Sequence, residues 1–131
     1  MMIDNMVKKL IDKTKKGKIT WIHVDKESVE IKDIKGFKLI KLYEVQQAYS
    51  VIAGDTKLVI TAERYMLGSA FSYENTYYLY LYSKSGVIFS QYGDSNTNDK
   101  TLLERLMTII KKGGVDENDL LESIEGFLDN L

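Results

Sequence analysis

The segment that constrains the fold most is a β-hairpin pattern at residues 76–92. Two runs, TYYLYLYS and VIFSQY, are rich in aromatic and β-branched residues, and their connection ends in Gly86. A glycine tolerates the positive φ that a tight connection needs, so the runs are expected to pair as antiparallel strands. Side chains alternate between the two faces of a strand, so one face carries Tyr78, Tyr80 and Tyr82.

Further β-rich runs precede this hairpin. The runs that predict strands are residues 18–24, 28–34, 37–53 and 57–67. In the long third run we expect a bulge near Gln46 and Gln47, and a helix is the alternative over residues 37–50. A hairpin turn is expected at residues 53–56 and a polar loop at residues 68–75.

Helical periodicity marks the two ends of the chain. The first apolar stripe consists of Ile3, Met6, Val7, Leu10 and Ile11, and the second of Leu103, Leu106, Met107 and Ile110. Gly17 supplies a left-handed cap for the first helix, and the pair Gly113 and Gly114 ends the second. Asn98 or Asp99 is expected to cap the start of the second helix.

A third helix follows at once. Asp116 is its expected N-cap, with Val115 and Leu120 at the spacing of a hydrophobic staple. The expected buried face consists of Leu120, Ile124, Phe127 and Leu131. The pattern as a whole predicts an α+β fold: an N-terminal helix, a five- to six-stranded antiparallel sheet and two C-terminal helices in a single domain, 1–131.

The composition narrows the setting of this domain. The chain of 131 residues contains no cysteine, which excludes disulfides, Cys-based zinc sites and a thiol nucleophile, and it favours a cytoplasmic location. No apolar run approaches the roughly 18 to 20 residues that cross a bilayer, so we expect no membrane anchor.

Three stretches carry a resemblance to a group of known proteins. The matching positions are Lys13-Thr14, Gly17-Lys18-Ile19 and Trp21, then Tyr77, Leu79, Leu81 and Gly86, then Val115-Asp116. In this pattern the chain resembles small uncharacterised proteins of bacterial phages and mobile elements. The resemblance implies no catalytic residues. It implies a setting in which small domains bind other proteins as inhibitors, immunity factors or antagonists of host defence.

The candidates for chemistry are few. The only histidine, His23, has no evident Ser or Thr partner, so no catalytic set is assembled. The acidic loop that begins at Asp94 has Asp99 where a calcium loop needs glycine and Arg105 where it needs glutamate. No phosphate-binding glycine motif is present. We therefore expect no enzyme, no metal site and no cofactor, and a small-molecule binder or minor enzyme around His23 is a minor alternative.

Nucleic-acid binding is the main alternative function. The first helix carries the lysines that would contact phosphates, and the tyrosine strand would stack bases. These lysines are Lys8, Lys9, Lys13, Lys15 and Lys16. The acidic pI of about 5.9 weighs against this alternative.

The leading hypothesis is a protein-binding accessory domain. Tyrosine suits protein interfaces because its large ring is rigid and its hydroxyl tolerates water, so Tyr78, Tyr80 and Tyr82 are candidate binding residues. The last helix contributes a second candidate surface, because from Asp116 onward the chain has acidic residues and no basic ones. The acidic candidates there are Glu122, Glu125 and Asp129. A homodimer through the tyrosine face is a further alternative.

Overall fold

The computed structural model of the chain describes residues 2–24, 43–67, 70–71, 75–83, 86 and 88–131. In chain order its elements are α1 (Asp4–Lys15), β1 (Ile22–His23), β2 (Tyr43–Ala53), β3 (Thr56–Leu67), β4 (Ala70–Phe71), β5 (Thr76–Tyr82), β6 (Ile88–Tyr92), the 3-10 turn η4 (Asp94–Asn96), α2 (Leu102–Lys111) and α3 (Glu117–Asp129). The predicted α+β class and the order of its parts are confirmed.

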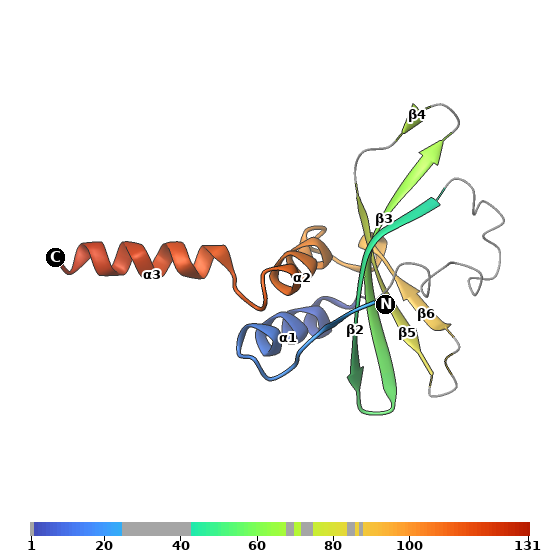
Figure 1. Cartoon of the computed structure of the whole chain (residues 1–131), viewed down its shortest axis with the longest axis horizontal. Coiled ribbons are helices and arrows are strands. Elements are labelled where there is room, and N and C mark those ends of the chain that lie inside the picture. Colours follow the sequence, from blue (N-terminus) through green and yellow to red (C-terminus); the bar gives the residue numbers. More distant parts are fainter. Residues whose placement is uncertain (1, 25–42, 68–69, 72–74, 84–85, 87) are drawn as a thin grey trace.

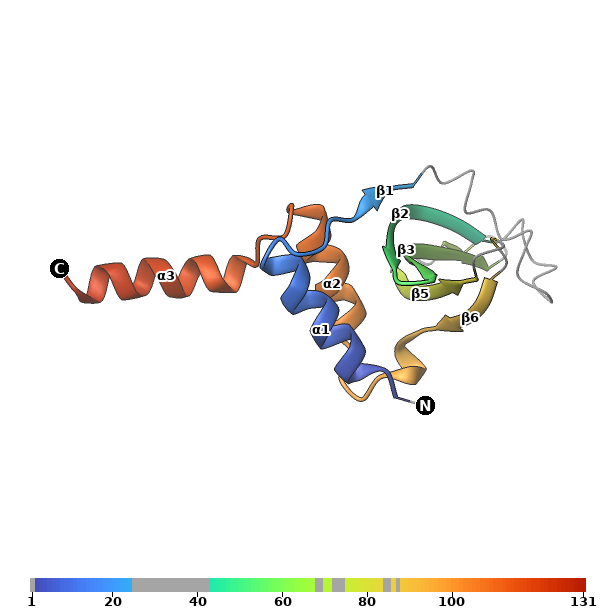
Figure 2. The same cartoon turned by 90° about the horizontal axis from the view of Figure 1, so that it is seen from below.

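The sheet is antiparallel in all its described pairings. Its strands lie in the order β1-β2-β3-β5-β6, and β4 pairs only with β3. The helices α1 and α2 lie side by side against one face of this curved sheet (Figures 1 and 2). The helix α3 projects away from both layers and ends far from the sheet.

The long central hairpin follows the sequence pattern closely. Ala53 pairs with Thr56 across a turn in which Gly54 has a φ of 62°, as the predicted turn requires. The register shifts between Val45 and Gln47, which confirms the expected bulge. Residues 43–53 are therefore strand and not helix, whereas the predicted strand at 28–34 and the start of the run at 37 lie outside the described residues.

The main core lies between the helices and the sheet. Its buried members come from α1, α2 and the inner face of β2, β3 and β5, among them Val7, Ile11, Ile60, Leu79, Leu103 and Leu106. Trp21 closes one end of this core, where its indole N–H donates to the Thr14 hydroxyl at 2.9 Å. That hydroxyl donates to the Leu10 carbonyl at 2.6 Å. The Thr and Trp of the first sequence motif are thus structural partners that fasten β1 to the end of α1.

The start of α2 differs from the prediction in detail. Thr101 occupies the N-cap position without a capping side-chain bond, while Asp99 accepts hydrogen bonds from the Thr101 amide and hydroxyl. Asp4 accepts from the amides of Asn98 and Asp99, and these bonds lower the pKa of the Asp4 carboxyl. The loop before α2 is therefore fastened to the first turn of α1.

The turn between α2 and α3 is a Schellman motif. The Gly114 amide donates to the Ile109 carbonyl at 2.9 Å and the Gly113 amide donates to the Ile110 carbonyl at 3.1 Å. Both glycines have positive φ, 70° and 91°. A Cβ on Gly114 would lie 2.8 Å from the Thr14 carbonyl oxygen, so this turn also packs directly on the end of α1.

The last helix begins as predicted but packs differently. Asp116 is its N-cap and accepts from the Asn118 amide at 3.0 Å. The expected buried face is wrong, because Leu120, Ile124, Phe127 and Leu131 are all more than half exposed. The turn directs α3 away from the core, so its apolar residues do not reach the sheet.

Replacement of Gly114 by alanine tests the role of this turn. The Cβ would meet the Thr14 carbonyl and force a left-handed backbone on alanine, so Gly114→Ala should lower the free energy of unfolding by more than about 1 kcal/mol in urea titrations. Gly126→Ala is the matched control, because no atom lies within 4 Å of its added Cβ. Equal stability of the two variants would contradict the proposed close packing.

Candidate protein-binding surface

The largest apolar feature exposed on the described surface follows one side of α3. Its members recur at helical spacing and are between 52% and 87% exposed: Leu120, Leu121, Ile124, Phe127, Leu128 and Leu131. Residues three, four and seven apart lie on the same face of a helix, so these side chains form one continuous stripe. We call this set the α3 stripe. Such a stripe is typical of a helix that packs against another surface.

The root of α3 is held to the body by ion pairs. The Lys15 ammonium lies 2.6 Å from Asp119 and 3.6 Å from Asp116, and the hydrogen bond to Asp119 raises the pKa of Lys15. On the other side Lys112 contacts Glu117 at 3.2 Å. These ion pairs all involve the N-cap and the first turn of α3, and the helix beyond Asp119 extends into solvent (Figure 2).

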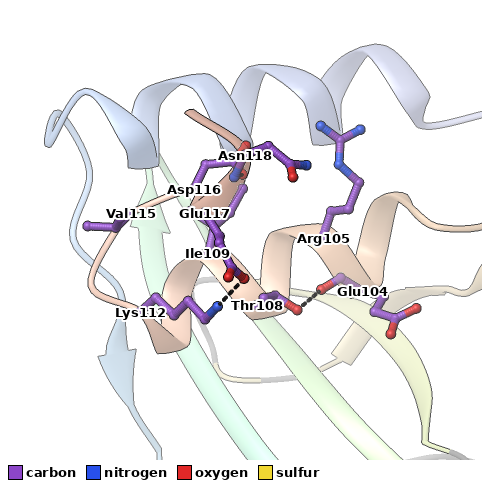
Figure 3. A pocket seen from close by; sticks show the side chains of 9 residues that line it. All are labelled: Glu104, Arg105, Thr108, Ile109, Lys112, Val115, Asp116, Glu117 and Asn118. Atoms are coloured by element: carbon purple, nitrogen blue, oxygen red, sulfur yellow. Dashed lines mark hydrogen bonds and ion pairs between the residues drawn. The ribbon is translucent and has the colours of Figure 1, made fainter. Parts of the chain in front are cut away.

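A hollow of about 250 Å³ lies where α3 leaves the body (Figure 3). Its lining comes from α2, the turn and the start of α3, and consists of Glu104, Arg105, Thr108, Ile109, Lys112, Val115, Asp116, Glu117 and Asn118. Glu117 is four and seven residues before Leu121 and Ile124, so it lies in line with the α3 stripe. The hollow is therefore the inner end of the same surface.

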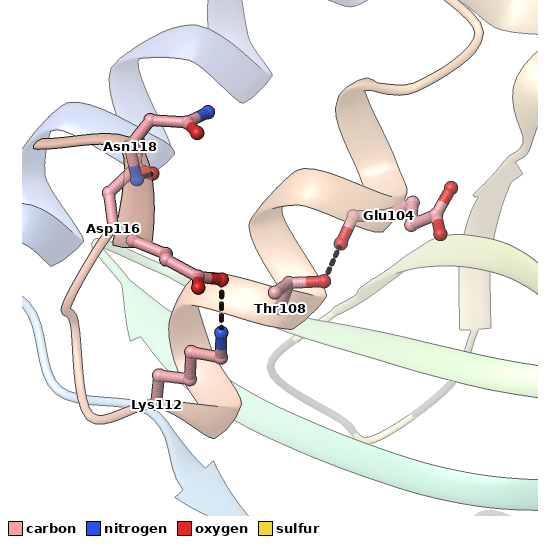
Figure 4. Close-up of polar contacts among 6 residues, drawn as sticks. Glu104, Thr108, Lys112, Asp116 and Asn118 are labelled. Atoms are coloured by element: carbon pink, nitrogen blue, oxygen red, sulfur yellow. Dashed lines mark hydrogen bonds and ion pairs between the residues drawn. The ribbon is translucent and has the colours of Figure 1, made fainter. Parts of the chain in front are cut away.

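Two polar contacts join side chains of this hollow to neighbouring groups (Figure 4). Thr108 donates to the Glu104 carbonyl at 2.9 Å, and Lys112 donates to Glu117 at 3.2 Å. Only the second contact joins two charged groups, and the Glu104 carboxylate and the Arg105 guanidinium take part in neither. The hollow thus offers both charged and apolar groups to another molecule.

The three acidic candidates of the last helix are placed together by the structure. Glu122, Glu125 and Asp129 are all exposed, and their spacing of three and four residues puts them on one flank of α3, where Glu125 borders the α3 stripe. The last helix thus carries both the predicted acidic candidates and the exposed apolar stripe. The sequence pattern did not predict the stripe as a surface, because the same apolar spacing also fits a helix that covers its own core.

The tyrosine row lies on the other side of the sheet, opposite the helices. Tyr80 is only 1% exposed and forms a second apolar cluster with Val45, Ala48 and Val59. Tyr78 and Tyr82 are half-buried and pack against this cluster. Of the three candidate tyrosines, Tyr80 is thus buried, because its ring fills a small core of its own, and only Tyr78 and Tyr82 are partly exposed.

A buried carboxylate that the sequence did not predict lies next to this second cluster. Glu63 is 0% exposed, and the Tyr80 hydroxyl donates to its two oxygens at 2.9 and 3.0 Å. Gln91 in turn donates to the Tyr80 oxygen at 3.2 Å. The available signal was strand alternation, which puts Glu63 in phase with the buried Val59 and Thr61 on β3.

The structure separates the two parts of the expected nucleic-acid site. The lysines lie on α1, which packs on the helical side of the sheet, whereas the tyrosine row lies on the opposite side. Lys8, Lys9 and Lys13 are exposed, while Lys15 and Lys16 are engaged in ion pairs with acidic residues. No single described surface combines these lysines with the tyrosines.

Two further candidates for chemistry were His23 and the acidic loop before α2. His23 is exposed on the edge strand β1, where its ring meets that of Tyr49 edge-on at 5.3 Å. In the loop before α2, the Lys100 ammonium donates to the carbonyls of Asp94 and Thr97. Within the ranges that the structure describes, no three His, Asp or Glu residues are grouped as metal ligands.

Comparison with protein-family models, with curated proteins and with solved structures finds no match to this chain. The resemblance to phage and mobile-element proteins therefore stays a prediction. None of the helices described here is both long and apolar enough to cross a bilayer.

Removal of the Tyr80 hydroxyl tests whether this tyrosine is structural. Tyr80→Phe leaves the buried Glu63 carboxylate without that donor, so it should lower the free energy of unfolding by about 1 to 3 kcal/mol. Tyr92→Phe is the control, because no hydrogen bond from its hydroxyl occurs in the described part of the chain. Urea titrations in which both variants match the parent would contradict a structural role.

Proposed function

We propose that the protein is a non-enzymatic protein-binding accessory domain that uses α3 to dock onto its partner. The observation that carries this proposal is the α3 stripe, six large apolar side chains that each expose more than half of their surface. Monomeric proteins rarely leave a contiguous apolar surface of this kind open without a binding role. The sheet and the helices α1 and α2 then form the scaffold that presents α3.

The energetics of α3 support docking over a purely solvated role. Isolated helices shorter than about 12 to 15 residues are marginal in water, and α3 has 13 residues with no core contact for its apolar side. Burial of one large apolar side chain contributes about 1.5 to 3 kcal/mol, so the stripe can offset the cost of association, about 4 to 15 kcal/mol. A partner would thus stabilise α3 and gain affinity from the same contacts.

The dimensions of α3 indicate the kind of contact. At 1.5 Å per residue a helix of this length extends about 20 Å, which fits a groove between two or three helices of a partner. Apolar anchors at intervals of three and four residues are the pattern that such grooves bind. The short length favours a small and reversible interface.

The resemblance noted in the sequence gives this proposal a biological setting. Small domains of phages and mobile elements act as inhibitors, immunity factors or antagonists of host defence, and each of these roles needs one specific contact with a target protein. We propose that α3 supplies that contact.

Substitution within the α3 stripe tests the proposed function. The triple variant Leu120→Gln, Ile124→Gln and Phe127→Gln removes three apolar anchors, so retention of the partner should fall by at least about 100-fold. The measurement is affinity capture from the source cells with quantitative mass spectrometry, and thermal unfolding should show an intact body.

The control replaces polar residues on the same helix. Ser123→Gln and Asn130→Gln change the surface outside the stripe and should leave capture unchanged. If the triple variant retains the same proteins in the same amounts as the parent, α3 is not the docking element.

A further inference from the structure

The acidic residues of α3 fall into two groups that differ in pairing. Those of the root are matched by bases of the body: Asp116 and Asp119 by Lys15, and Glu117 by Lys112. Glu122, Glu125 and Asp129 have no ion pair or hydrogen bond through their side chains in the described part of the chain. The unmatched charge of α3 is therefore confined to its outer part.

This unmatched charge lies on only one flank of α3. With 3.6 residues per turn, Glu125 lies next to Leu121 and Leu128, and Asp129 and Glu122 lie further round the helix on the same flank. The edge next to Leu120 and Phe127 carries instead the small or neutral residues Ser123, Gly126 and Asn130. The two edges of the stripe thus differ in charge.

The position of Asp129 makes this arrangement unfavourable for the free helix. The C-terminal end of a helix carries a partial negative charge, and the last turn of α3 contains Asp129 and no basic residue. No lysine or arginine occurs after Lys112, so α3 cannot neutralise its acidic edge from its own sequence. A cation supplied from outside would relieve this repulsion.

We infer that the partner presents an apolar helix-binding groove with lysines or arginines along one rim, and this inference rests on the proposed docking role of α3. The apolar floor of the groove would take the α3 stripe, and the basic rim would face Glu122, Glu125 and Asp129. Because the unmatched charge of α3 lies on one flank alone, the rim also fixes which way the helix runs along the groove.

A second copy of this chain fits the acidic edge less well. Antiparallel pairing of two α3 helices would place acidic edge against acidic edge, and parallel pairing would place it against Ser123, Gly126 and Asn130 without a cation. The exposed lysines of α1 flank buried apolar residues and offer no apolar groove. The large apolar residues exposed on the described body are scattered over several elements: Met2, Ile22, Ile52 and Phe89.

The test uses two designed helical hairpins as partners for the full chain. Both present the same apolar groove, and one rim carries lysines in the first hairpin and glutamates in the second. Fluorescence anisotropy should show at least about tenfold tighter binding of the lysine hairpin at low salt, an advantage that shrinks at high salt. All 18 basic residues precede α3 in the sequence, so electrostatic attraction to the rest of the protein favours the glutamate hairpin. Tighter binding of the lysine hairpin must therefore come from the acidic residues of α3.

Substitutions in α3 test whether the preference for the lysine hairpin comes from its acidic residues. Glu122→Gln, Glu125→Gln and Asp129→Gln together should abolish the preference for lysine, whereas Ser123→Gln with Asn130→Gln should preserve it. Equal binding of both hairpins that still depends on Ile124 and Phe127 would overturn the basic rim and leave the docking role intact.

Two further outcomes would show that the α3 stripe binds neither type of groove or that it binds a second copy of the chain. Binding of neither hairpin would overturn both the docking role and the basic rim. A dimer in light scattering that Ile124→Gln with Phe127→Gln dissociates would assign the α3 stripe to a second copy and overturn the inference.

Discussion

The exposed position of α3 depends on the turn at Gly113 and Gly114. The turn ends α2 with two backbone hydrogen bonds, and Gly114 approaches the Thr14 carbonyl so closely that no side chain fits between them. Thr14 also bonds to Trp21, so the same point joins α1, the start of β1 and the exit of α2. A helix that leaves from such a fixed point has a defined direction, and α3 points away from the core.

The two described core clusters contain no residue of α3. Two helices cover the inner face of the sheet, and the outer face builds a second cluster around Tyr80 with the buried Glu63. The apolar residues of α3 thus lie outside both clusters, and the root of the helix is held by the turn and by ion pairs with Lys15 and Lys112. Exposed ion pairs contribute little to stability, so they orient α3 more than they bind it. This combination is suited to a presented docking element.

Much of the fold was predictable because local rules determine it. The cap at Asp116, the bulge at Gln46 and Gln47 and the positive φ of Gly86 all follow from residue chemistry, and the structure confirms them. The candidate site was predictable only in part. Helical periodicity shows that α3 has an apolar side, but it carries no information on whether that side meets its own core or another molecule.

The tyrosine row illustrates the same limit on a strand. Alternation placed Tyr78, Tyr80 and Tyr82 on one face, which the structure confirms, yet it could not show that Tyr80 is buried over Glu63. Burial depends on partners from β2, β3 and β6, which are distant in sequence. Pairing across such distances is set by the whole sheet and not by the local pattern.

The central claim, that the α3 stripe is open in the free protein, can be tested by cysteine labelling, because the chain has no cysteine of its own. Single variants Ile124→Cys on the stripe, Glu125→Cys on its edge and Leu106→Cys in the core would be alkylated under native conditions. The account predicts that Cys at position 124 reacts as fast as Cys at position 125 and far faster than Cys at position 106. Protection at position 124 equal to that in the core would contradict it.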